Sequence, residues 1–325
     1  MTVFIIRRLI QALVVVILMS LIVFFGVNVV GDPVYMLVSP DADQAEIAAT
    51  IARLGLDRPI WEQYWLFVTN ALQGDLGNSF IFGEPALRLI FQHMPATLEL
   101  AFSALFLSVV IGIPLGLYAG LYPESVAGKA IMAGSILGFS LPTFWVGLML
   151  IMLFAVQLGW LPSTGRGDTV SVMGVETSLL TLDGLSHLFM PALNLALTNI
   201  SLAIRLTRSG VREAMGQDYV KFARAKGLST RRIIGLHVLK NIMIPVVTVM
   251  GLEFGALIAF SVVTETIFAW PGMGKLLIDA ILQLDRPVVV AYLMLIVVLF
   301  VVINLIVDIL YSILDPRVRL QDQGA

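Results

Sequence analysis

Six long runs of apolar residues limit what this chain can fold into. A helix needs about 20 apolar residues to cross a bilayer, and such runs lie at 9–30, 97–121, 131–158, 189–207, 245–268 and 288–313. Only 13% of the residues are charged, whereas soluble domains carry about 25%. We therefore predict an all-α integral membrane protein with six transmembrane helices. The first run exceeds the roughly 7–15 apolar residues of a signal peptide, so we expect it to be a retained helix.

The basic residues predict the orientation of these helices. If both ends of the chain lie inside, the cytoplasmic segments hold 14 lysines and arginines and the outer segments hold 6. Cytoplasmic segments of membrane proteins are enriched in lysine and arginine. Nine of these residues lie between Arg205 and Lys240. We therefore expect both termini and this basic loop to be cytoplasmic.

Several kinds of chemistry have no support in the sequence. The chain has no cysteine, which excludes disulfides and thiolate metal sites, and its histidines at 93, 187 and 237 lack metal-ligand spacing. No phosphate-binding loop of the form G-x-x-x-x-G-K-[ST] is present, and no nucleophile–base pair is readable. We expect a non-catalytic chain with no catalytic residue, no metal and no cofactor of its own, and no nucleic-acid partner.

The basic loop has helix signals at its centre. Asp218 is a favourable N-cap for a helix over Tyr219–Lys226, and Gly227 is a natural residue to end it. Ser229 is expected to cap a second helix that runs up to Pro245. Residues Tyr219, Phe222, Ala223 and Lys226 recur at i, i+3, i+4 and i+7, which places them on one face of the first helix.

Two turns of helix are not stable alone in water, so packing on both sides must hold this one. The membrane helices of the chain would pack below it, and another protein above. An anchor that binds anionic lipid and an element that docks a partner protein both fit the loop.

A family resemblance includes this loop and extends over nearly the whole chain. The segment ARAKGLSTRRIIGLHVLKNIMIPVVT (223–248) resembles the coupling loop, or EAA loop, of permease subunits of ATP-binding-cassette (ABC) importers of the dipeptide, oligopeptide, nickel and glutathione branch. Further matching segments follow in the same order as in that family: FIIRRL near the start, GDP at 31–33, LGLDRP at 54–59, QGDLGNS at 73–79, ATLEL at 96–100, LGWLP at 158–162, TRS at 207–209, TETIFAWPGMG at 264–274 and NLIVDILYSILDPRVR at 304–319. One departure is Lys221, which stands where the general EAA pattern has glutamate.

The resemblance implies an assembly in the bacterial inner membrane. A second homologous permease, two ATPases that bind ATP and Mg²⁺, and an extracytoplasmic solute-binding protein would join this chain, which would have the fold of a type I ABC importer transmembrane domain. The cargo would be short peptides. The residues expected to couple to an ATPase are Asp218, Tyr219, Phe222, Ala223, Arg224, Ala225, Lys226 and Gly227.

The resemblance also divides the chain into parts. Residues 1–96 would form the first transmembrane helix and an external loop, and 97–315 a core of five transmembrane helices with the coupling loop at about 208–244. Residues 316–325 would be a cytoplasmic tail. Within the external loop, we expect a short helix over Asp41–Arg53 and a second one that begins at Pro59.

Polar residues inside the predicted spans are candidates for the translocation path, because a charge in the bilayer usually faces a cavity or a partner. We select Glu253, Glu265, Asn194 and Asn199. For each, an interhelical hydrogen bond is the alternative, and for Glu265 a structural cap or gate contact is favoured over a binding site. Glu99 is expected to be satisfied by nearby backbone or interfacial water, and Pro271–Gly274 to form a turn-rich outer loop.

Small residues four apart predict close helix contacts. They lie at Gly112, Gly116 and Gly120, at Gly134 and Gly138, and at Gly251 and Gly255.

Two other functions are compatible with a helical membrane protein. One is an ion-coupled secondary transporter, although the sequence shows no inverted repeat. The other is a membrane scaffold or receptor that transports nothing.

Overall fold

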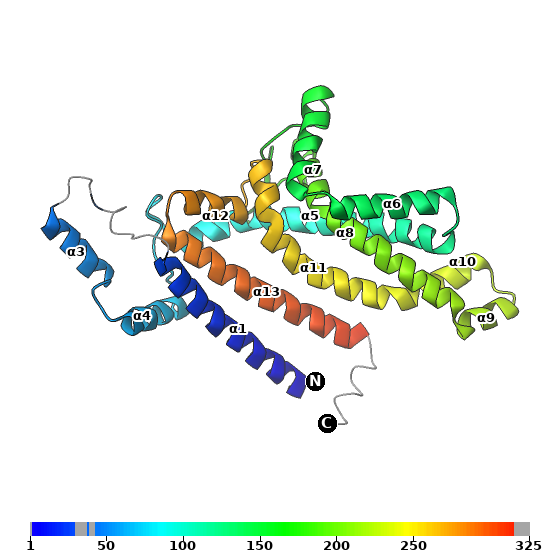
Figure 1. Ribbon diagram of the computed structural model, residues 1–325, viewed down its shortest axis with the longest axis horizontal. Helices are drawn as coiled ribbons and strands as arrows, with labels where there is room; N and C mark the ends of the chain where they lie inside the picture. Colours follow the sequence, from blue (N-terminus) through cyan, green and yellow to red (C-terminus); the bar gives the residue numbers. More distant parts are fainter. Residues whose placement is uncertain (1, 30–37, 39–42, 315–325) are drawn as a thin grey trace. The chain divides into compact units, whose positions relative to one another are not determined.

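The protein is almost entirely helical in a computed structural model that describes residues 2–29, 38 and 43–314 (Figure 1). Its helices are α1 (Thr2–Val29), α3 (Gln44–Leu54), α4 (Ile60–Leu72), α5 (Ala86–Leu121), α6 (Val126–Ser140), α7 (Thr143–Leu150), α8 (Leu182–Gly216), α9 (Asp218–Ala225), α10 (Thr230–Arg232), α11 (Lys240–Ile267), α12 (Met273–Leu282) and α13 (Arg286–Leu314). Two π-helices, η1 (Ile151–Gln157) and η2 (Ile233–Leu239), continue α7 and precede α11, and strands β1 (Val170–Val172) and β2 (Val175–Thr177) form a hairpin.

The helices form two compact units. The first unit contains the described residues up to Pro95 together with Pro271–Val301, and the second contains Ala96–Trp270 and the described residues from Val302 onward. The family-like segment GDP at 31–33, the predicted helix start at Asp41 and the predicted tail 316–325 lie outside the described residues.

Five helical segments among the described residues are long and apolar enough to cross a membrane. They are Ile6–Gly26, Ala86–Leu121, Leu182–Gly216, Thr230–Ile267 and Arg286–Ile309. The predicted third span, 131–158, is different, because α6 and the helix that runs from Thr143 to Gln157 meet at a bend of 107°. Counted as one broken span, this pair is the sixth crossing.

Pro142 explains why the predicted third span is bent and not one continuous helix. Leu141 and Pro142 both have extended backbone, with ψ values of 134° and 130°. A proline has no N–H for the preceding turn and disfavours helical backbone in the residue before it. The helix therefore ends at Ser140 and a new one begins after Pro142.

Glycines bring α5 and α8 into close contact in the second unit. A Cβ added to Gly112, Gly116 or Gly120 would lie 2.6–2.7 Å from atoms of α8, which leaves no space for it. Gly138 of α6 faces the Ser201 hydroxyl of α8 in the same way, at 2.9 Å. The prediction of tight helix packing is confirmed for these four glycines, whereas a Cβ on Gly134 would have no described neighbour within 4 Å.

In the first unit, α3 begins at Gln44, three residues after the predicted start, whereas α4 begins after Pro59 as predicted. The Asp43 side chain accepts a hydrogen bond from the backbone N–H of Glu46 and so caps α3, which ends at Gly55. Pro59 is the N-cap of α4. After Gly272, α12 begins at Met273, so the predicted turn-rich loop at Pro271–Gly274 in fact leads directly into a helix.

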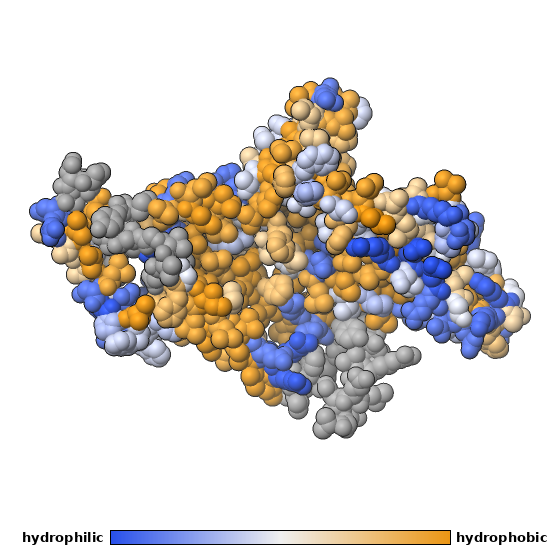
Figure 2. All heavy atoms as spheres, viewed as in Figure 1, coloured by the Kyte–Doolittle hydropathy of each residue, from blue (hydrophilic) through white to orange (hydrophobic). Residues whose placement is uncertain are grey.

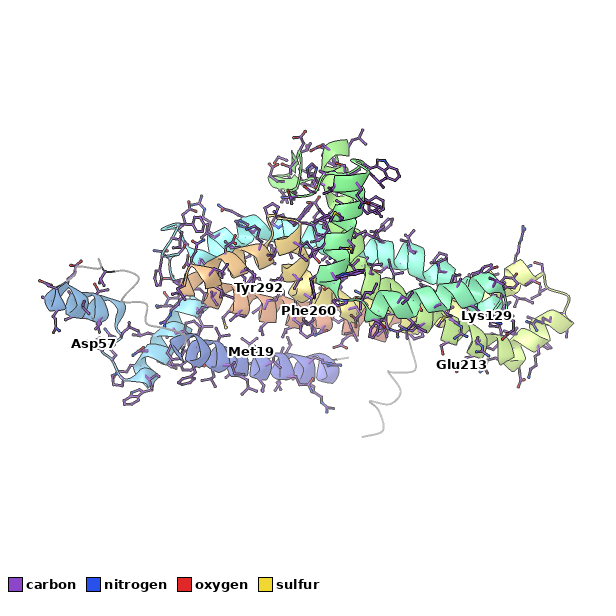
Figure 3. All side chains as sticks on the ribbon, turned by 45° about the horizontal axis from the view of Figure 1, so that its top comes forward. Met19, Asp57, Lys129, Glu213, Phe260 and Tyr292 are labelled. Carbon is purple, nitrogen blue, oxygen red and sulfur yellow. The ribbon has the colours of Figure 1, made fainter. Side chains whose placement is uncertain are left out.

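An apolar cavity of about 430 Å³ lies beside α1 in the first unit. Met19, Ile22 and Val23 of α1 line it together with Val289 and Leu293 of α13. Figure 3 labels Met19 on α1 and Tyr292 on α13.

We predict that Gly116→Ala destabilises the protein. The new methyl group would lie 2.7 Å from the backbone oxygen of Ile204 and from the Cβ of Thr207, and overpacking of this kind costs about 1–3 kcal/mol. The measurement is the thermal unfolding midpoint of the purified complex. Gly134→Ala is the matched control, because its methyl group meets nothing described within 4 Å. Equal midpoints for the two variants would contradict the close α5–α8 contact.

Candidate coupling surface and polar groups of the bundle

The candidate coupling helix α9 begins one residue earlier than predicted. Gln217 is its N-cap, with extended backbone, and the Gln217 carbonyl accepts from the N–H groups of Val220 and Lys221. Asp218 is therefore the first helical residue rather than the cap. Its carboxylate accepts from Lys221 Nζ at 2.8 Å, and a negative charge in the first turn stabilises a helix through its dipole.

Gly227 ends α9 as predicted. The Gly227 N–H donates to the carbonyl of Arg224 at 2.9 Å, and the Leu228 N–H donates to that of Ala223 at 3.2 Å. Gly227 has a φ of +74°. These two bonds and the left-handed glycine form a Schellman motif, which glycine adopts at the lowest cost.

One face of α9 packs on the chain. Val220 and Ala223 are buried in a cluster that also contains Val211 and Ala214 of α8, Ile233 and Val238 of η2, and Ile242 of α11. Tyr219 and Phe222, which the spacing places on one face with Ala223, are 39% and 62% exposed. The ring of Phe222 lies 4.6 Å from the ammonium group of Lys226. The helix is thus held by packing on one side, and the side that carries its aromatic residues is exposed.

The second helix of the loop does not end at Pro245. Helical structure runs without a break from Thr230 through η2 and α11 to Ile267. Ile242 and Val246, on either side of Pro245, are buried, and prolines are tolerated within membrane helices because neighbouring groups satisfy the freed backbone. A short turn at 226–229 therefore joins α9 directly to a membrane-spanning helix.

Polar residues gather at the end of the second unit that carries α9 and α10. Figure 2 shows hydrophilic atoms over these helices and the adjoining end of α8. Figure 3 places the labelled Lys129 of α6 and Glu213 of α8 at the same end. The two segments that were both predicted to be cytoplasmic, around Lys129 and from Arg205 to Lys240, therefore lie on one side of the unit.

Asn194 and Glu265 belong to one buried polar cluster. Asn194 Nδ2 donates to Thr264 Oγ1 at 3.0 Å, while the Glu265 carboxylate accepts from Thr97 Oγ1 at 2.7 Å and from Ser261 Oγ at 2.8 Å. Asn194 and Glu265 are both fully buried. Since Thr264 and Glu265 are neighbours on α11, this cluster joins α5, α8 and α11.

Glu253 and Asn199 lie apart from that cluster. Asn199 is buried on α8. Glu253 is half-buried on α11, seven residues before the 74%-exposed Phe260, which places both residues on one helix face. Within the described part of the chain no hydrogen-bond donor or cation is bonded to the Glu253 carboxylate.

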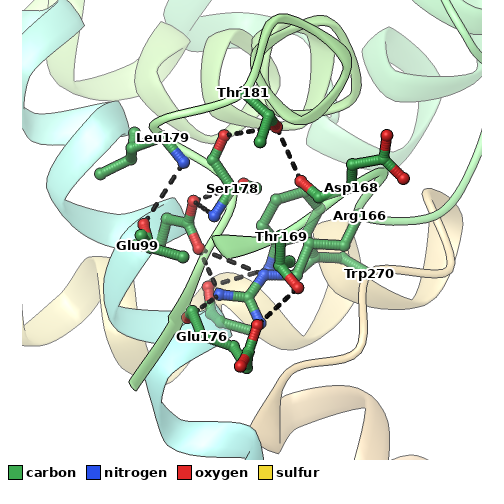
Figure 4. A network of polar contacts seen from close by, with 11 residues as sticks. Glu99, Arg166, Asp168, Thr169, Glu176, Ser178, Leu179, Thr181 and Trp270 are labelled. Carbon is green, nitrogen blue, oxygen red and sulfur yellow. Dashed lines mark hydrogen bonds and ion pairs between the residues drawn. The ribbon is translucent and has the colours of Figure 1, made fainter. Parts of the chain in front are cut away.

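An ion pair that the sequence did not predict holds the segment between η1 and α8 in place (Figure 4). Glu99 of α5 and Arg166 form a hydrogen-bonded pair with side chains only 5% and 12% exposed. The Glu99 carboxylate also accepts from the N–H of Ser178 at 2.9 Å, and Arg166 donates to the carbonyl of Glu176 at 2.7 Å. A backbone group does bond Glu99, as expected, but its cationic partner lies 67 residues away in the chain and was not predicted.

Trp270 completes this network. The guanidinium of Arg166 lies 5.9 Å from the centre of the Trp270 ring, and the indole N–H of Trp270 donates to the carbonyl of Ala96 at 2.9 Å. The hairpin and the start of α8 are thus tied to α5 by charge and by hydrogen bonds.

We predict that Arg166→Met destabilises the segment between η1 and α8. Removing one partner of a buried ion pair costs about 3–5 kcal/mol, so the thermal midpoint falls and protease cleavage within residues 159–188 increases. Arg88→Met is the control, because Arg88 and Glu84 form an exposed pair at 3.8 Å and such pairs contribute about 0–1 kcal/mol. Similar losses for both variants would argue against a structural role of the Glu99–Arg166 pair.

Comparison with known proteins identifies the family of this chain. Residues 112–320 match the model of the binding-protein-dependent transport system inner membrane component, and residues 1–101 match that of its N-terminal part. The chain belongs to this family. It is therefore a permease subunit of an ABC transporter.

Similar curated proteins cover almost the whole chain. The di/tripeptide transport system permease protein DppB of Pseudomonas aeruginosa (strain UCBPP-PA14) is 40% identical, over 92% of this chain and 95% of the relative. The dipeptide permease DppB and the glutathione permease GsiC of Escherichia coli (strain K12) are 37% and 35% identical, each over 97% of this chain and 98% of the relative.

A solved structure supports the fold. A chain of the inward-facing MetNI methionine ABC transporter is 17% identical and has a TM-score of 0.53, over 70% of this chain and 96% of that one. The predicted fold class, an all-α type I ABC importer transmembrane domain, is confirmed, with the β1–β2 hairpin as a small addition.

Proposed function

We propose that this chain forms half of the translocation path of an ATP-driven importer of short peptides in the bacterial inner membrane. Relatives that are 35–40% identical over nearly their full length are named for di/tripeptides, dipeptides and glutathione, which is itself a tripeptide. A solute-binding protein delivers the peptide from outside, and a second homologous permease completes the path. Two ATPase subunits bind ATP and Mg²⁺ on the cytoplasmic side, where both termini of this chain lie.

The observation that best supports this proposal is the bare aromatic face of α9. An isolated helix of eight residues is unstable, yet α9 is held by Val220 and Ala223 and presents Phe222, 62% exposed, away from the bundle. A helix fixed in this way transmits a push as a rigid body. Because its cluster includes residues of α8, η2 and α11, a force on α9 reaches both flanking membrane helices.

Each residue of the proposed coupling surface has a separate task. Tyr219 and Phe222 insert into a groove of the ATPase. The exposed basic groups of Arg224 and Lys226 orient α9 in that groove. The remaining residues shape the helix: Asp218 with Lys221 stabilises its start, Ala223 packs below, Ala225 permits close approach, and Gly227 ends it. With Lys221 in place of a glutamate, the contact does not depend on one acidic side chain.

Glu253 is our first candidate for the wall of the path, because its carboxylate has no described partner in the chain and could bind the amino group of a peptide. Asn194 and Glu265 are buried and bonded to side chains of other helices, Asn194 to Thr264 and Glu265 to Thr97, which favours a role in closing the path. Asn199, which is buried on α8, is a second candidate for the wall. Neither an ion-coupled transporter nor a scaffold is favoured by any observation, since the family is defined by dependence on a binding protein.

We predict that Phe222→Asp uncouples transport from ATP hydrolysis. The substitution places a charge on an exposed apolar contact without touching the packed face, so the complex assembles but peptide uptake into proteoliposomes is lost. Phe222→Met is the control, because it keeps an apolar side chain and retains uptake. Normal uptake by Phe222→Asp would show that α9 is not the coupling element.

Gly227 gives an independent test of the same helix. Gly227→Pro fixes φ near −65°, which is incompatible with the observed +74°, so α9 loses its end and uptake falls. The methyl group of Gly227→Ala meets nothing described within 4 Å. Its only cost is that of holding a residue other than glycine in the left-handed conformation, about 1–2 kcal/mol. We expect it to keep most of the uptake, and equal effects of the two changes would argue against the Schellman motif as the reason for glycine.

We predict that Glu253→Gln slows peptide transport while the basal ATPase rate stays unchanged. A hydrogen bond to a charged group contributes about 1.5–3 kcal/mol, so the loss in transport efficiency is about tenfold or more. The measurement is uptake of a labelled dipeptide at several concentrations of loaded binding protein. Glu213→Gln, an exposed acid on α8, is the control, and an unchanged uptake in Glu253→Gln would remove this residue from the path.

A further inference from the structure

Contacts between α4 and α1 fix the depth of α4 in the membrane. The hydroxyl groups of Tyr64 and Ser20 are hydrogen-bonded at 2.8 Å, and the ring of Phe24 lies 5.4 Å from that of Tyr64 and 5.7 Å from that of Phe67. The apolar stretch of α1 ends at Gly26. At a rise of 1.5 Å per residue, Ser20 and Phe24 lie about 9 Å and 3 Å before that end.

This depth is inconsistent with a helix that lies in water above the membrane. The last roughly 10 Å of a spanning helix pass through the boundary between acyl chains and headgroups, where amphipathic helices insert to about 5–10 Å. Since Tyr64 and Phe67 reach α1 at this level, the body of α4 lies in the same boundary.

The surface of α4 is divided into three arcs. Tyr64, Phe67 and Ala71 recur at helical spacing and form the side that faces α1. A neighbouring apolar stripe, which we call the tryptophan stripe, consists of Trp61, Trp65, Val68 and Leu72, and the two tryptophans are 70% and 67% exposed. The third arc is mostly polar and contains Glu62, Thr69, Asn70 and Gln73, with Leu66 as its one apolar member, 38% exposed.

We infer that α4 is an interfacial helix whose tryptophan stripe binds the phospholipid boundary layer. The exposed apolar residues Leu13 and Ile17 of α1 lie on the same helix face as Ser20 and Phe24, which contact α4, by the i, i+7 spacing of a helix, so one bilayer covers both helices. Tryptophan is enriched at this level of membranes, because its ring is apolar and its N–H needs a polar partner. The polar arc of α4 has no lysine or arginine, so this binding rests on apolar area rather than on attraction to anionic lipid.

Because the chain has no cysteine, a single introduced cysteine can be labelled specifically. The single variants Trp61→Cys, Trp65→Cys and Leu72→Cys place a nitroxide label on the stripe, and Leu72→Cys leaves both tryptophans intact. Glu62→Cys and Asn70→Cys place it on the polar arc as controls. The assembled transporter, with cysteine-free partner subunits, is reconstituted in phosphatidylcholine vesicles, and label accessibility to oxygen and to a water-soluble nickel chelate is measured by electron paramagnetic resonance.

We expect the stripe labels to collide several-fold more with oxygen than with the chelate, and the polar-arc labels to show the reverse. Adding anionic lipid leaves both patterns unchanged. If stripe and polar-arc labels are equally accessible to the chelate, α4 is a water-exposed cap and the inference is wrong. If the stripe labels are shielded from both reagents, another protein subunit covers the stripe, which also overturns it.

Discussion

The close contact of α5 with α8 is the constraint on which the rest of the second unit depends. In a bilayer, apolar surface gains little by leaving lipid, so helices associate through tight packing. At Gly112, Gly116 and Gly120 this packing brings α5 against backbone and side chains of α8 with no space for a Cβ. Because α5 carries Thr97 and Glu99 and α8 carries Asn194, the contact also aligns both buried polar networks. At its far end, α8 leads directly into α9, the proposed coupling helix.

Much of this architecture was predictable from the sequence, because the relevant signals are local. Run length and charge predict membrane helices, glycines four apart predict their close contact, and Gly227 predicts where α9 ends. The family segments extend this to the fold class. The break at Pro142 is also a local signal, and it was missed because the apolar run continues on both sides of it.

The features that the sequence did not predict depend on contacts between distant residues. Glu99 is paired with Arg166, and Glu265 is bonded to Thr97, which lies 168 residues away. On α9, spacing alone places Tyr219, Phe222 and Ala223 on one side. Which side packs is decided by Val220, whose small apolar side chain fits the cluster formed by α8, η2 and α11. In a protein that meets partners, large aromatic residues are not a reliable sign of the inward face.

The π-helix η2 has a consequence for how α11 is interpreted. Its hydrogen bonds span one residue more than those of an α-helix, so each turn contains more residues and the direction of successive side chains drifts relative to the 3.6-residue period. Side chains before Ile233 and after Leu239 therefore do not follow one helical wheel. A helical wheel that starts in α9 or α10 would assign the faces of α11 incorrectly. The wheel for α11 has to start again at Lys240.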